Sequence, residues 1–293
     1  MKIEDVIIIG AGPAGIAAAI QLRRYGIKPL IFEKDRIGGL LKNADMVENY
    51  PGFPDGISGR ELITALEKHL GNSNHIYFED MIELDFEDNL FTVISTGRKI
   101  QSRIIIVASG TVPIDFSDIT IPDESKDRIL YEIHTILEEN GKKITIVGAG
   151  DAAFDYALNL GRNNKIVILN RSDRTNFLPL LRERAADEDN IEYLDNARVI
   201  SVKNNPDDQL SICYRRDGKE KELRADYLVF AIGRKPATGF FSDRLNDNKD
   251  RLLKDGLLYM IGDVNNGLYR QTAIATGNGI KAAMKTAAKL KGN

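Results

Sequence analysis

The stretch KKITIVGAGDAAFDYALNL, residues 142–160, has the pattern of a nucleotide-binding turn in the middle of a 293-residue chain. A short apolar run precedes Gly148 and Gly150, and Ala153 takes the third position of the G-x-G-x-x-G pattern. A similar stretch, VIIIGAGPAGIAAAIQL, occupies residues 6–22. Two such turns in one chain predict two dinucleotide-binding folds.

The N-terminal stretch carries the fuller fingerprint. Gly10 permits a tight turn, Gly12 lets the backbone approach a pyrophosphate, and Gly15 allows close helix packing. A strand predicted over residues 28–32 follows the helix, and Glu33 stands at its end, where a carboxylate accepts hydrogen bonds from ribose hydroxyls. The complete βαβ context favours dinucleotide binding over a turn whose glycines serve packing alone.

The two turns differ in the residue after the second strand. Arg171 lies 23 residues after Gly148, as Glu33 lies 23 residues after Gly10. A carboxylate suits ribose hydroxyls, whereas a guanidinium, aided by Arg174, binds a 2′-phosphate. The first site is therefore predicted to hold FAD and the second NADPH, with NADH as the alternative. The competing interpretation is that both arginines are solvated surface charges.

The duplication extends beyond the glycines. A hairpin pattern around residues 96–97 precedes an apolar strand ending in Ser109-Gly110, and a second hairpin around residues 217–218 precedes a strand ending in Ile232-Gly233. The fold class is therefore predicted to be α/β, with two Rossmann-like three-layer domains. Near the C-terminus, the strand GLLYMIGDV (256–264) ends in Gly262-Asp263, and a helix is expected from about Gln271 to Leu290. Asp263 either binds ribityl hydroxyls or caps this helix.

Composition excludes several classes of partner. The formal net charge is −3 with both signs interspersed, so no nucleic-acid partner is expected. No apolar run approaches the roughly 20 residues that cross a bilayer, and no signal peptide is recognised at the N-terminus. Cys213 is the single cysteine, which rules out an intramolecular disulfide within these residues and favours a cytoplasmic location. No cluster of metal ligands is recognised, so no metal is predicted.

The chain resembles the low-molecular-weight thioredoxin reductases and the related thioredoxin-reductase-like ferredoxin-NADP reductases from end to end. Besides the two turns, collinear segments carry the likeness: VENYPGFPDGISGREL (47–62), GRKPAT (233–238), GDV (262–264) and YRQ (269–271). The resemblance implies an FAD domain of residues 1–111 and 246–293, with an NAD(P)H domain of residues 112–245 inserted between them. It also implies a homodimer.

The resemblance implies roles for matching positions. Those expected at FAD are Gly10, Gly12, Pro13, Ala14, Gly15, Glu33, Lys34, Gly38, Gly39, Leu40, Asn49, Ser109, Gly110, Gly262, Asp263, Arg270, Gln271 and Thr272. Those expected at NAD(P)H are Gly148, Gly150, Asp151, Ala152, Ala153, Arg171, Arg174, Ile232, Gly233 and Arg234.

The sequence departs from the thioredoxin reductases at their redox-active C-x-x-C. Counting back from Gly148 places that motif on residues 131–134, which read Tyr-Glu-Ile-His. Tyr131 and His134 form no disulfide, and Cys213 in an apolar alternating strand is expected to be a buried structural thiol. His134 is a candidate proton donor or acceptor beside the flavin, or else a connector residue.

The ferredoxin-NADP reductases of the family also lack the cysteine pair, but they extend past the last helix with an aromatic residue over the flavin. This sequence ends at Asn293 and keeps Tyr269-Arg270-Gln271, which is closer to the thioredoxin reductase version. The expected activity is therefore an FAD-dependent NAD(P)H oxidoreductase that delivers electrons to an external acceptor, either a protein or a small molecule. The alternative to an enzyme is a flavin-binding redox-responsive module that no longer uses NAD(P)H.

Overall fold

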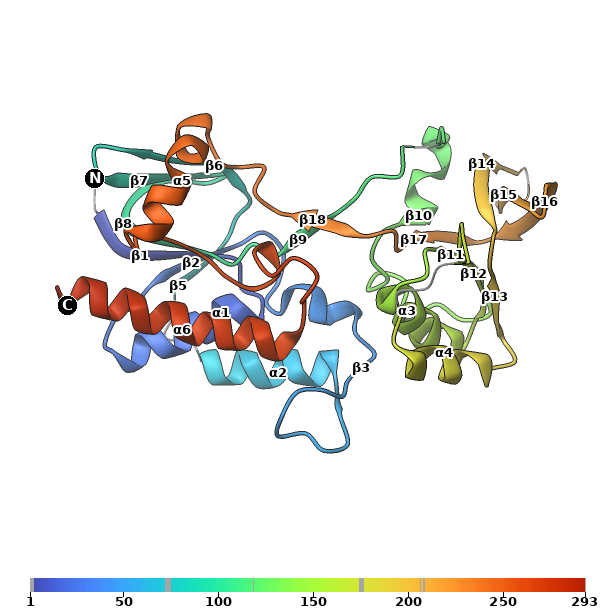
Figure 1. The fold of residues 1–293 in the computed structure, drawn as a ribbon, viewed down its shortest axis with the longest axis horizontal. Coiled ribbons are helices and arrows are strands. Elements are labelled where there is room, and N and C mark those ends of the chain that lie inside the picture. Colours follow the sequence, from blue (N-terminus) through green and yellow to red (C-terminus); the bar gives the residue numbers. More distant parts are fainter. Residues whose placement is uncertain are drawn as a thin grey trace. The chain divides into compact units, whose positions relative to one another are not determined.

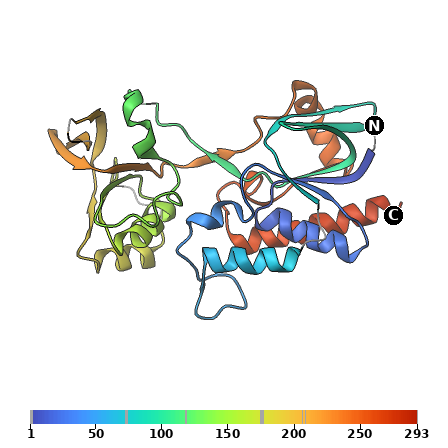
Figure 2. The same cartoon turned by 180° about the vertical axis from the view of Figure 1, so that it is seen from behind.

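The computed structural model describes residues 3–71, 75–117, 119–173, 177–205, 207 and 209–292, which divide into two compact units (Figures 1 and 2). Unit 1 comprises Met1–Lys42, Met46–Val112 and Lys235–Asn293. Unit 2 comprises Asn43–Asp45 and Pro113–Arg234. Unit 1 is built on a mixed β-sheet and unit 2 on a parallel one, and each sheet has layers on both faces. The predicted α/β class with two Rossmann-like three-layer units is confirmed.

The sheet of unit 1 has the strand order β5-β2-β1-β8-β7-β6, with β19 also paired to β8. β1 lies parallel to β2 and β8, whereas β6 and β7 form an antiparallel hairpin beside β8. The strands are β1 (Ile3–Ile9), β2 (Leu30–Glu33), β5 (His75–Phe78), β6 (Met81–Glu87), β7 (Leu90–Ser95), β8 (Lys99–Val107) and β19 (Leu258–Met260). A separate short hairpin pairs β3 (Met46–Val47) with β4 (Ile57–Ser58).

Both faces of β1 are buried, as its continuous apolar run predicts. Val6 and Ile8 face α1, α2 and α6, whereas Ile7 and Ile9 face the core beneath α5. Figure 1 shows α1, α2 and α6 on one face of the sheet and α5 on the other. The helical segments are α1 (Pro13–Arg24), η1 (Gly39–Asn43), α2 (Gly59–Leu70), α5 (Asp243–Lys254), η3 (Gly262–Val264) and α6 (Thr272–Leu290).

The sheet of unit 2 has the order β10-β17-β11-β12-β13, and its neighbouring strands are parallel. One face packs against α3 and α4, and the other against the antiparallel sheet β14-β15-β16. The elements are η2 (Asp123–Arg128), β10 (Ile129–Leu130), β11 (Lys143–Val147), α3 (Asp151–Gly161), β12 (Lys165–Leu169), α4 (Pro179–Ala186), β13 (Ile191–Leu194), β14 (Arg198–Asn204), β15 (Leu210–Arg216), β16 (Lys219–Ala225) and β17 (Tyr227–Phe230). Two connecting strands, β9 (Thr111–Pro113) and β18 (Arg234–Pro236), pair with each other.

The division differs from the expected one at residues 235–245, which cluster with unit 1. Leu84 N donates to Phe240 O at 2.7 Å, and Ser242 N donates to Leu84 O at 3.0 Å. These bonds attach the segment to the outer strand β6. Such pairing is invisible in the sequence because its partners lie more than 150 residues apart.

A second difference concerns residues 43–45, which lie in the first half of the sequence but cluster with unit 2. The Asn43 side chain explains the difference, because its Oδ1 accepts the N–H groups of Ile133 and His134, each at 3.1 Å. Asn43 is only 2% exposed. The assignment of FAD to one half and NAD(P)H to the other stays a prediction.

Candidate functional site

The first glycine turn connects β1 to α1, and glycine occupies its three positions for different physical reasons. A Cβ on Gly10 (φ +106°) would lie 2.2 Å from Ala108 O, and one on Gly15 would lie 1.9 Å from Gly10 O. Backbone packing therefore requires glycine at both positions. Gly12 has an ordinary φ of −75°, and its Cβ would meet nothing within 4 Å. The fold itself gives no reason for glycine at this position.

Gly12 is the N-cap of α1, and Pro13 occupies the first helical position. Because Gly12 has no side chain to accept a hydrogen bond, no side chain at the N-cap bonds to the first N–H groups of the helix. Uncapped N–H groups together with the helix dipole make an anion site. The open space at Gly12 therefore fits a pyrophosphate, which is the group that FAD would place there.

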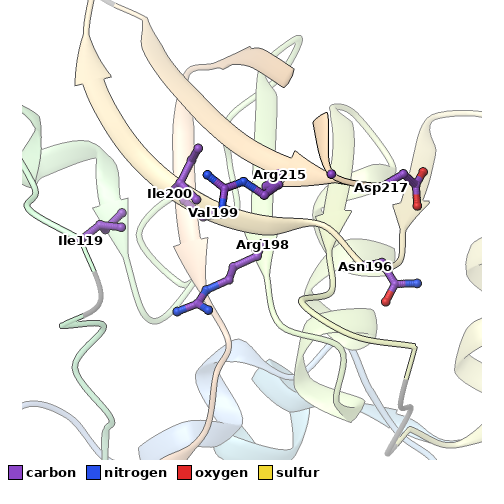
Figure 3. A pocket seen from close by; sticks show the side chains of 8 residues that line it. Ile119, Asn196, Arg198, Val199, Ile200, Arg215 and Asp217 are labelled. Carbon is purple, nitrogen blue, oxygen red and sulfur yellow. The ribbon is translucent and has the colours of Figure 1, made fainter. Parts of the chain in front are cut away.

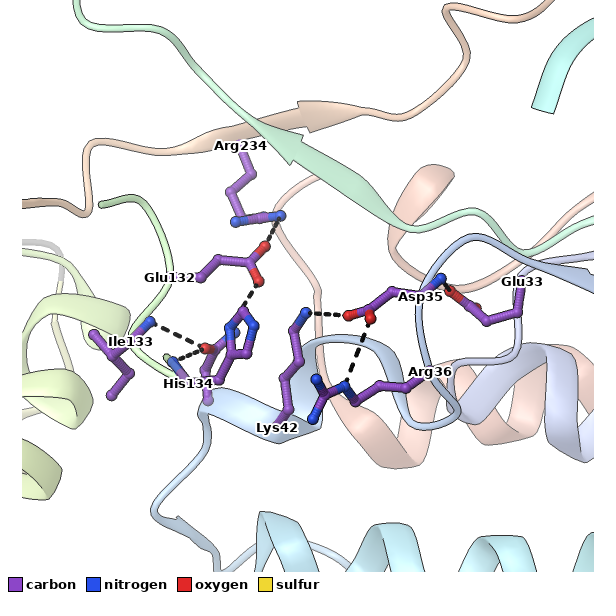
Figure 4. Close-up of polar contacts among 9 residues, drawn as sticks. Glu33, Asp35, Arg36, Lys42, Glu132, Ile133, His134 and Arg234 are labelled. Carbon is purple, nitrogen blue, oxygen red and sulfur yellow. Dashed lines mark hydrogen bonds and ion pairs between the residues drawn. The ribbon is translucent and has the colours of Figure 1, made fainter. Parts of the chain in front are cut away.

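Glu33 is held beside this turn at the end of β2. Its Oε2 accepts from Ala11 N at 2.7 Å and its Oε1 accepts from Asp35 N at 3.1 Å, and the side chain is 8% exposed (Figure 4). The two N–H donors fix the carboxylate next to the helix N-terminus. Lys34, which follows it, is exposed. The arrangement suits a carboxylate that accepts hydrogen bonds from a ribose.

The loop after Glu33 returns to the glycine turn. Gly38 N donates to Ala11 O at 2.9 Å, and a Cβ on Gly39 would lie 3.4 Å from Gly12 Cα. Lys42 Nζ lies 3.1 Å from Asp35 Oδ2 (Figure 4), and this hydrogen bond lowers the pKa of Asp35. The predicted residues Gly38 and Gly39 are thus brought beside the glycine turn, and Leu40 follows them in η1.

Segments distant in the sequence complete the region in unit 1. A Cβ on Gly262 (φ +69°) would lie 2.8 Å from Ala14 Cβ, so the turn carrying Asp263 lies against the start of α1. Asn49 Nδ2 donates to Gln271 Oε1 at 2.9 Å, at the N-cap of α6. The same helix end carries Arg270 and Thr272. Close to Gly10, Ser109 Oγ donates to Ala237 O at 2.7 Å, and Gly110 O accepts from Ala237 N at 3.1 Å.

The second glycine turn, between β11 and α3, has the same pattern of one crowded and one open glycine position. A Cβ on Gly148 (φ +129°) would lie 2.3 Å from Ala231 O, whereas one on Gly150 would meet nothing within 4 Å. Ala153 is fully buried at the third position. Gly150 is the N-cap of α3 and no side chain caps this helix, an arrangement that would fit a second anion. Ile232 and Gly233 follow β17, next to Ala231, and Asp151 and Ala152 are exposed at the start of α3.

The structure corrects the matching of Arg171 to Glu33. Gly10 N donates to Phe32 O at 2.7 Å, and the equivalent bond in unit 2 joins Gly148 N to Leu169 O at 3.0 Å. The residue equivalent to Glu33 is therefore Asn170, because the second copy is one residue shorter between the glycine and the strand end. Arg171 is the next residue, and its side chain is exposed. Arg174 lies outside the described residues.

Asn170 repeats one contact of Glu33, the hydrogen bond from the N–H group two residues further on, without the charge. Its Oδ1 accepts from Ser172 N at 3.3 Å, two residues on, and its Nδ2 donates to Tyr193 Oη at 2.9 Å. The side chain is 6% exposed. A neutral amide replaces a carboxylate at the strand end, so the electrostatic obstacle to a 2′-phosphate is absent at this position.

Residues 131–134 lie in a charged cluster of unit 2. Glu132 Oε1 lies 3.1 Å from Arg234 Nη2, and Glu132 Oε2 lies 3.6 Å from His134 Nδ1 (Figure 4). Tyr156 on α3 lies near Glu132 and Arg234. Burial of its side chain is the main cause that raises the pKa of Tyr156 to about 12, so its hydroxyl group stays protonated at neutral pH. The sequence does not reveal this cluster, because Glu132 and Arg234 are 102 residues apart. The role of His134 as a proton donor or acceptor stays a prediction.

Cys213 differs from its predicted environment. It is half-buried on β15, on the face opposite the buried Ile212 and Tyr214, and its cross-strand neighbours are Ser201 and Glu222. The expectation of a buried thiol is therefore wrong. The alternation along β15 places Cys213 on the outer face of the three-stranded sheet.

A pocket of about 370 Å³ lies over β14 and β15, where Arg198 and Arg215 are directly paired across the strands (Figure 3). The predicted nucleotide-binding residues are not among those that line it. Within the described residues, no group of three or more His, Cys, Asp or Glu side chains is arranged to hold a metal ion. Nor does any helix in this described part have the length and hydropathy needed to span a membrane.

The comparisons with known proteins agree with the fold. The family model of the pyridine nucleotide-disulphide oxidoreductases matches residues 4–279. The chain is 31% identical, over 99% of its length, to NADPH-dependent thioredoxin reductase 3 of Arabidopsis thaliana. It is 30% identical, over 96% of its length, to the bifunctional thioredoxin reductase/thioredoxin of Mycobacterium leprae. It spans 59% and 65% of the length of these two relatives.

Among solved structures, the thioredoxin reductase of Lactococcus lactis matches with a TM-score of 0.87 and 24% identity, covering 99% of this chain and 100% of that one. The chain therefore belongs to the pyridine nucleotide-disulphide oxidoreductase family, a family of FAD-dependent NAD(P)H oxidoreductases. Within this family it is thioredoxin reductase-like, which confirms the resemblance noted in the sequence.

Proposed function

We propose that unit 1 holds FAD, that unit 2 holds NADPH, and that the chain passes reducing equivalents from NADPH to an acceptor outside these 293 residues. FAD would supply the redox chemistry, whereas the residues of the chain bind and orient the two nucleotides. The observation that carries the proposal is the pair Gly12 and Gly150. Both cap a helix after a buried parallel strand, and packing requires glycine at neither position.

The charges beside the two turns support different nucleotides. Glu33 presents a fixed carboxylate in unit 1, whereas unit 2 presents the neutral Asn170 followed by the exposed Arg171. A carboxylate favours ribose hydroxyls and repels a 2′-phosphate, and a guanidinium attracts one. This difference supports FAD in unit 1 and NADPH in unit 2.

The number of cysteines supports an electron acceptor outside the chain. Cys213 is the single cysteine of the chain, so these residues form no internal disulfide that could be reduced and then attack a substrate disulfide. The same feature favours a second candidate activity within the proposal, that of a ferredoxin- or flavodoxin-NADP reductase.

Anaerobic titration of the purified flavoprotein tests the proposal. NADPH is expected to bleach the flavin absorbance at about one equivalent per chain, and a panel of acceptors should then restore it. If the protein binds FAD but neither NADPH nor NADH bleaches the flavin absorbance, the proposed activity is wrong and the protein is a flavin-binding module.

Arg171→Ala is expected to reduce the preference for NADPH over NADH. Losing a charge-assisted phosphate contact costs on the order of 1.5 to 3 kcal/mol, or about one to two decades in affinity. Rates of flavin reduction at varied NADPH and NADH concentrations measure the effect. Arg215→Ala removes another exposed arginine of unit 2, paired with Glu220, and is the matched control. Unchanged discrimination in Arg171→Ala would remove this residue from the site.

We also propose that two copies associate through α6. Ile274, Ile280 and Met284 are exposed on this helix, beside the equally exposed Gly277. A mid-helix glycine costs about 1 kcal/mol relative to alanine, and no neighbour in the described chain requires it. Light scattering is expected to give about twice the chain mass of 32.6 kDa, and Met284→Glu should shift it toward one chain. A monomer for the unaltered protein would contradict the expectation.

A further inference from the structure

Tyr193 on β13 carries a hydroxyl group that the packing of unit 2 does not require. The centroid of its ring lies 5.7 Å from that of Phe154 on α3, which accounts for the aromatic part of the side chain. Its hydroxyl oxygen accepts a hydrogen bond from Asn170 Nδ2 at 2.9 Å. A phenylalanine would keep the ring contact and lose only this bond. The hydroxyl group therefore acts on Asn170, the residue that follows β12.

Asn170 is only 6% exposed, and its amide is held at both ends. The oxygen accepts from Ser172 N at 3.3 Å, and the nitrogen donates to Tyr193 Oη. In unit 1, backbone N–H groups hold the corresponding side chain of Glu33, among them that of Ala11 at 2.7 Å. In unit 2, one of the anchors is a side chain on the neighbouring strand. Because a buried polar group that loses a partner costs free energy, removal of the Tyr193 hydroxyl group would loosen the Asn170 amide.

The bond between Asn170 and Ser172 spans Arg171. An asparagine side chain that accepts the N–H two residues further on closes an Asx-turn, and Arg171 is the residue inside this turn. The backbone on both sides of Arg171 is thereby fixed, whereas its side chain is exposed. A guanidinium on a fixed backbone samples fewer positions, so it loses less entropy when it binds a phosphate.

We infer that Tyr193 is a positioning residue for nucleotide specificity: by holding the amide of Asn170, it stabilises the turn from which Arg171 reaches the 2′-phosphate of NADPH. The inference rests on the proposed NADPH function of unit 2. It assigns to Tyr193 a role in the discrimination between nucleotides, without contact to either of them. Local sequence patterns do not mark this role, because Tyr193 and Asn170 are 23 residues apart and belong to different strand ends.

Equilibrium binding of NADP⁺ and NAD⁺ to the FAD-loaded protein, measured by isothermal titration calorimetry, tests the inference. Tyr193→Phe removes the hydroxyl group and keeps the ring contact with Phe154. The NADP⁺ affinity is expected to fall about three- to tenfold, the effect of one hydrogen bond, and the NAD⁺ affinity by less than about twofold. The limiting rate of flavin reduction at saturating NADPH should stay unchanged, because Tyr193 acts on binding and not on the transfer step.

Variants of the two residues between Tyr193 and the phosphate trace the route of the effect. Asn170→Ala by itself should reproduce the selective loss of NADP⁺ affinity. In that background the amide is absent, so Tyr193→Phe should cause no further change in the ratio of the two affinities. In an Arg171→Ala background the guanidinium is absent, and the ratio should again be insensitive to Tyr193→Phe. A general loosening of unit 2 would instead persist in both backgrounds.

Tyr227→Phe is the matched control. Tyr227 is also half-buried on a strand of the unit 2 sheet, and its hydroxyl group donates to Glu139 Oε1 at 3.3 Å. It lies at the start of β17, beside Ile144, whereas the glycine turn follows Val147 at the other end of the sheet. Tyr227→Phe should therefore leave both affinities within about twofold of those of the unaltered protein.

The outcomes separate the inference from the proposed function. An unchanged ratio of NADP⁺ to NAD⁺ affinity in Tyr193→Phe would overturn the inference, as would a full effect that persists without Asn170 or Arg171. In these cases a loss of discrimination in Arg171→Ala would still support the NADPH site. If Arg171→Ala itself leaves discrimination unchanged, the proposed phosphate site is wrong and the positioning role of Tyr193 fails with it.

Discussion

Gly12→Val is expected to abolish FAD binding while leaving unit 1 folded. The position has a φ of −75°, and a Cβ built there meets nothing within 4 Å, so neither the backbone conformation nor the space around the Cβ requires glycine. That side chain would instead fill the space in front of the N-terminus of α1, where a pyrophosphate needs the backbone. The FAD affinity should fall by at least about two decades, or ~3 kcal/mol.

Flavin absorbance per chain after purification, together with circular dichroism, measures this result. Gly239→Val is the matched control, because Gly239 is also exposed in unit 1 and its Cβ would likewise meet nothing within 4 Å. It should retain full flavin. Gly10→Val is unsuitable as a probe, since its Cβ would lie 2.2 Å from Ala108 O and disturb the fold. A folded Gly12→Val protein with full flavin content would show that the proposed FAD site is misplaced.

Thioredoxin is expected to be a poor electron acceptor for this chain. Thiol–disulfide exchange requires a thiolate that attacks the substrate disulfide and a second thiol that resolves the mixed disulfide. Residues 131–134 supply no thiol, and Cys213 has no partner cysteine in the sequence. NADPH oxidation with thioredoxin should be slower, by roughly two orders of magnitude or more, than with ferredoxin or a small quinone.

Steady-state NADPH oxidation with each acceptor measures this difference. Cys213→Ser is the control, and its rates should equal those of the unaltered protein with every acceptor. Fast thioredoxin reduction that survives in Cys213→Ser would contradict the prediction and require a route without protein thiols. Rapid flavin reduction with no turnover on any acceptor would indicate a dedicated partner protein.

Local sequence patterns were sufficient for the architecture. The apolar runs before Gly10 and Gly148 become β1 and β11, and the turns at residues 96–97 and 217–218 lie between the strands of β-hairpins. The turn pattern also predicts that glycine is needed at Gly10. It does not identify the neighbour that makes it necessary, which is the backbone of Ala108. These features follow from the sequence because strand periodicity and turn geometry depend on residues close together in the chain.

The tertiary structure decided the features that depend on distant partners. It showed that Asn170, and not Arg171, is the residue of unit 2 equivalent to Glu33. The hydrogen bond from Gly148 N to Leu169 O fixes this equivalence, whereas counting residues from the glycine does not. The tertiary structure also placed Cys213 on the outer face of its sheet, joined Glu132 to Arg234, and bonded Asn170 to Tyr193. Hydrogen bonds and ion pairs between remote segments form only after the sheets assemble, so no local pattern encodes them.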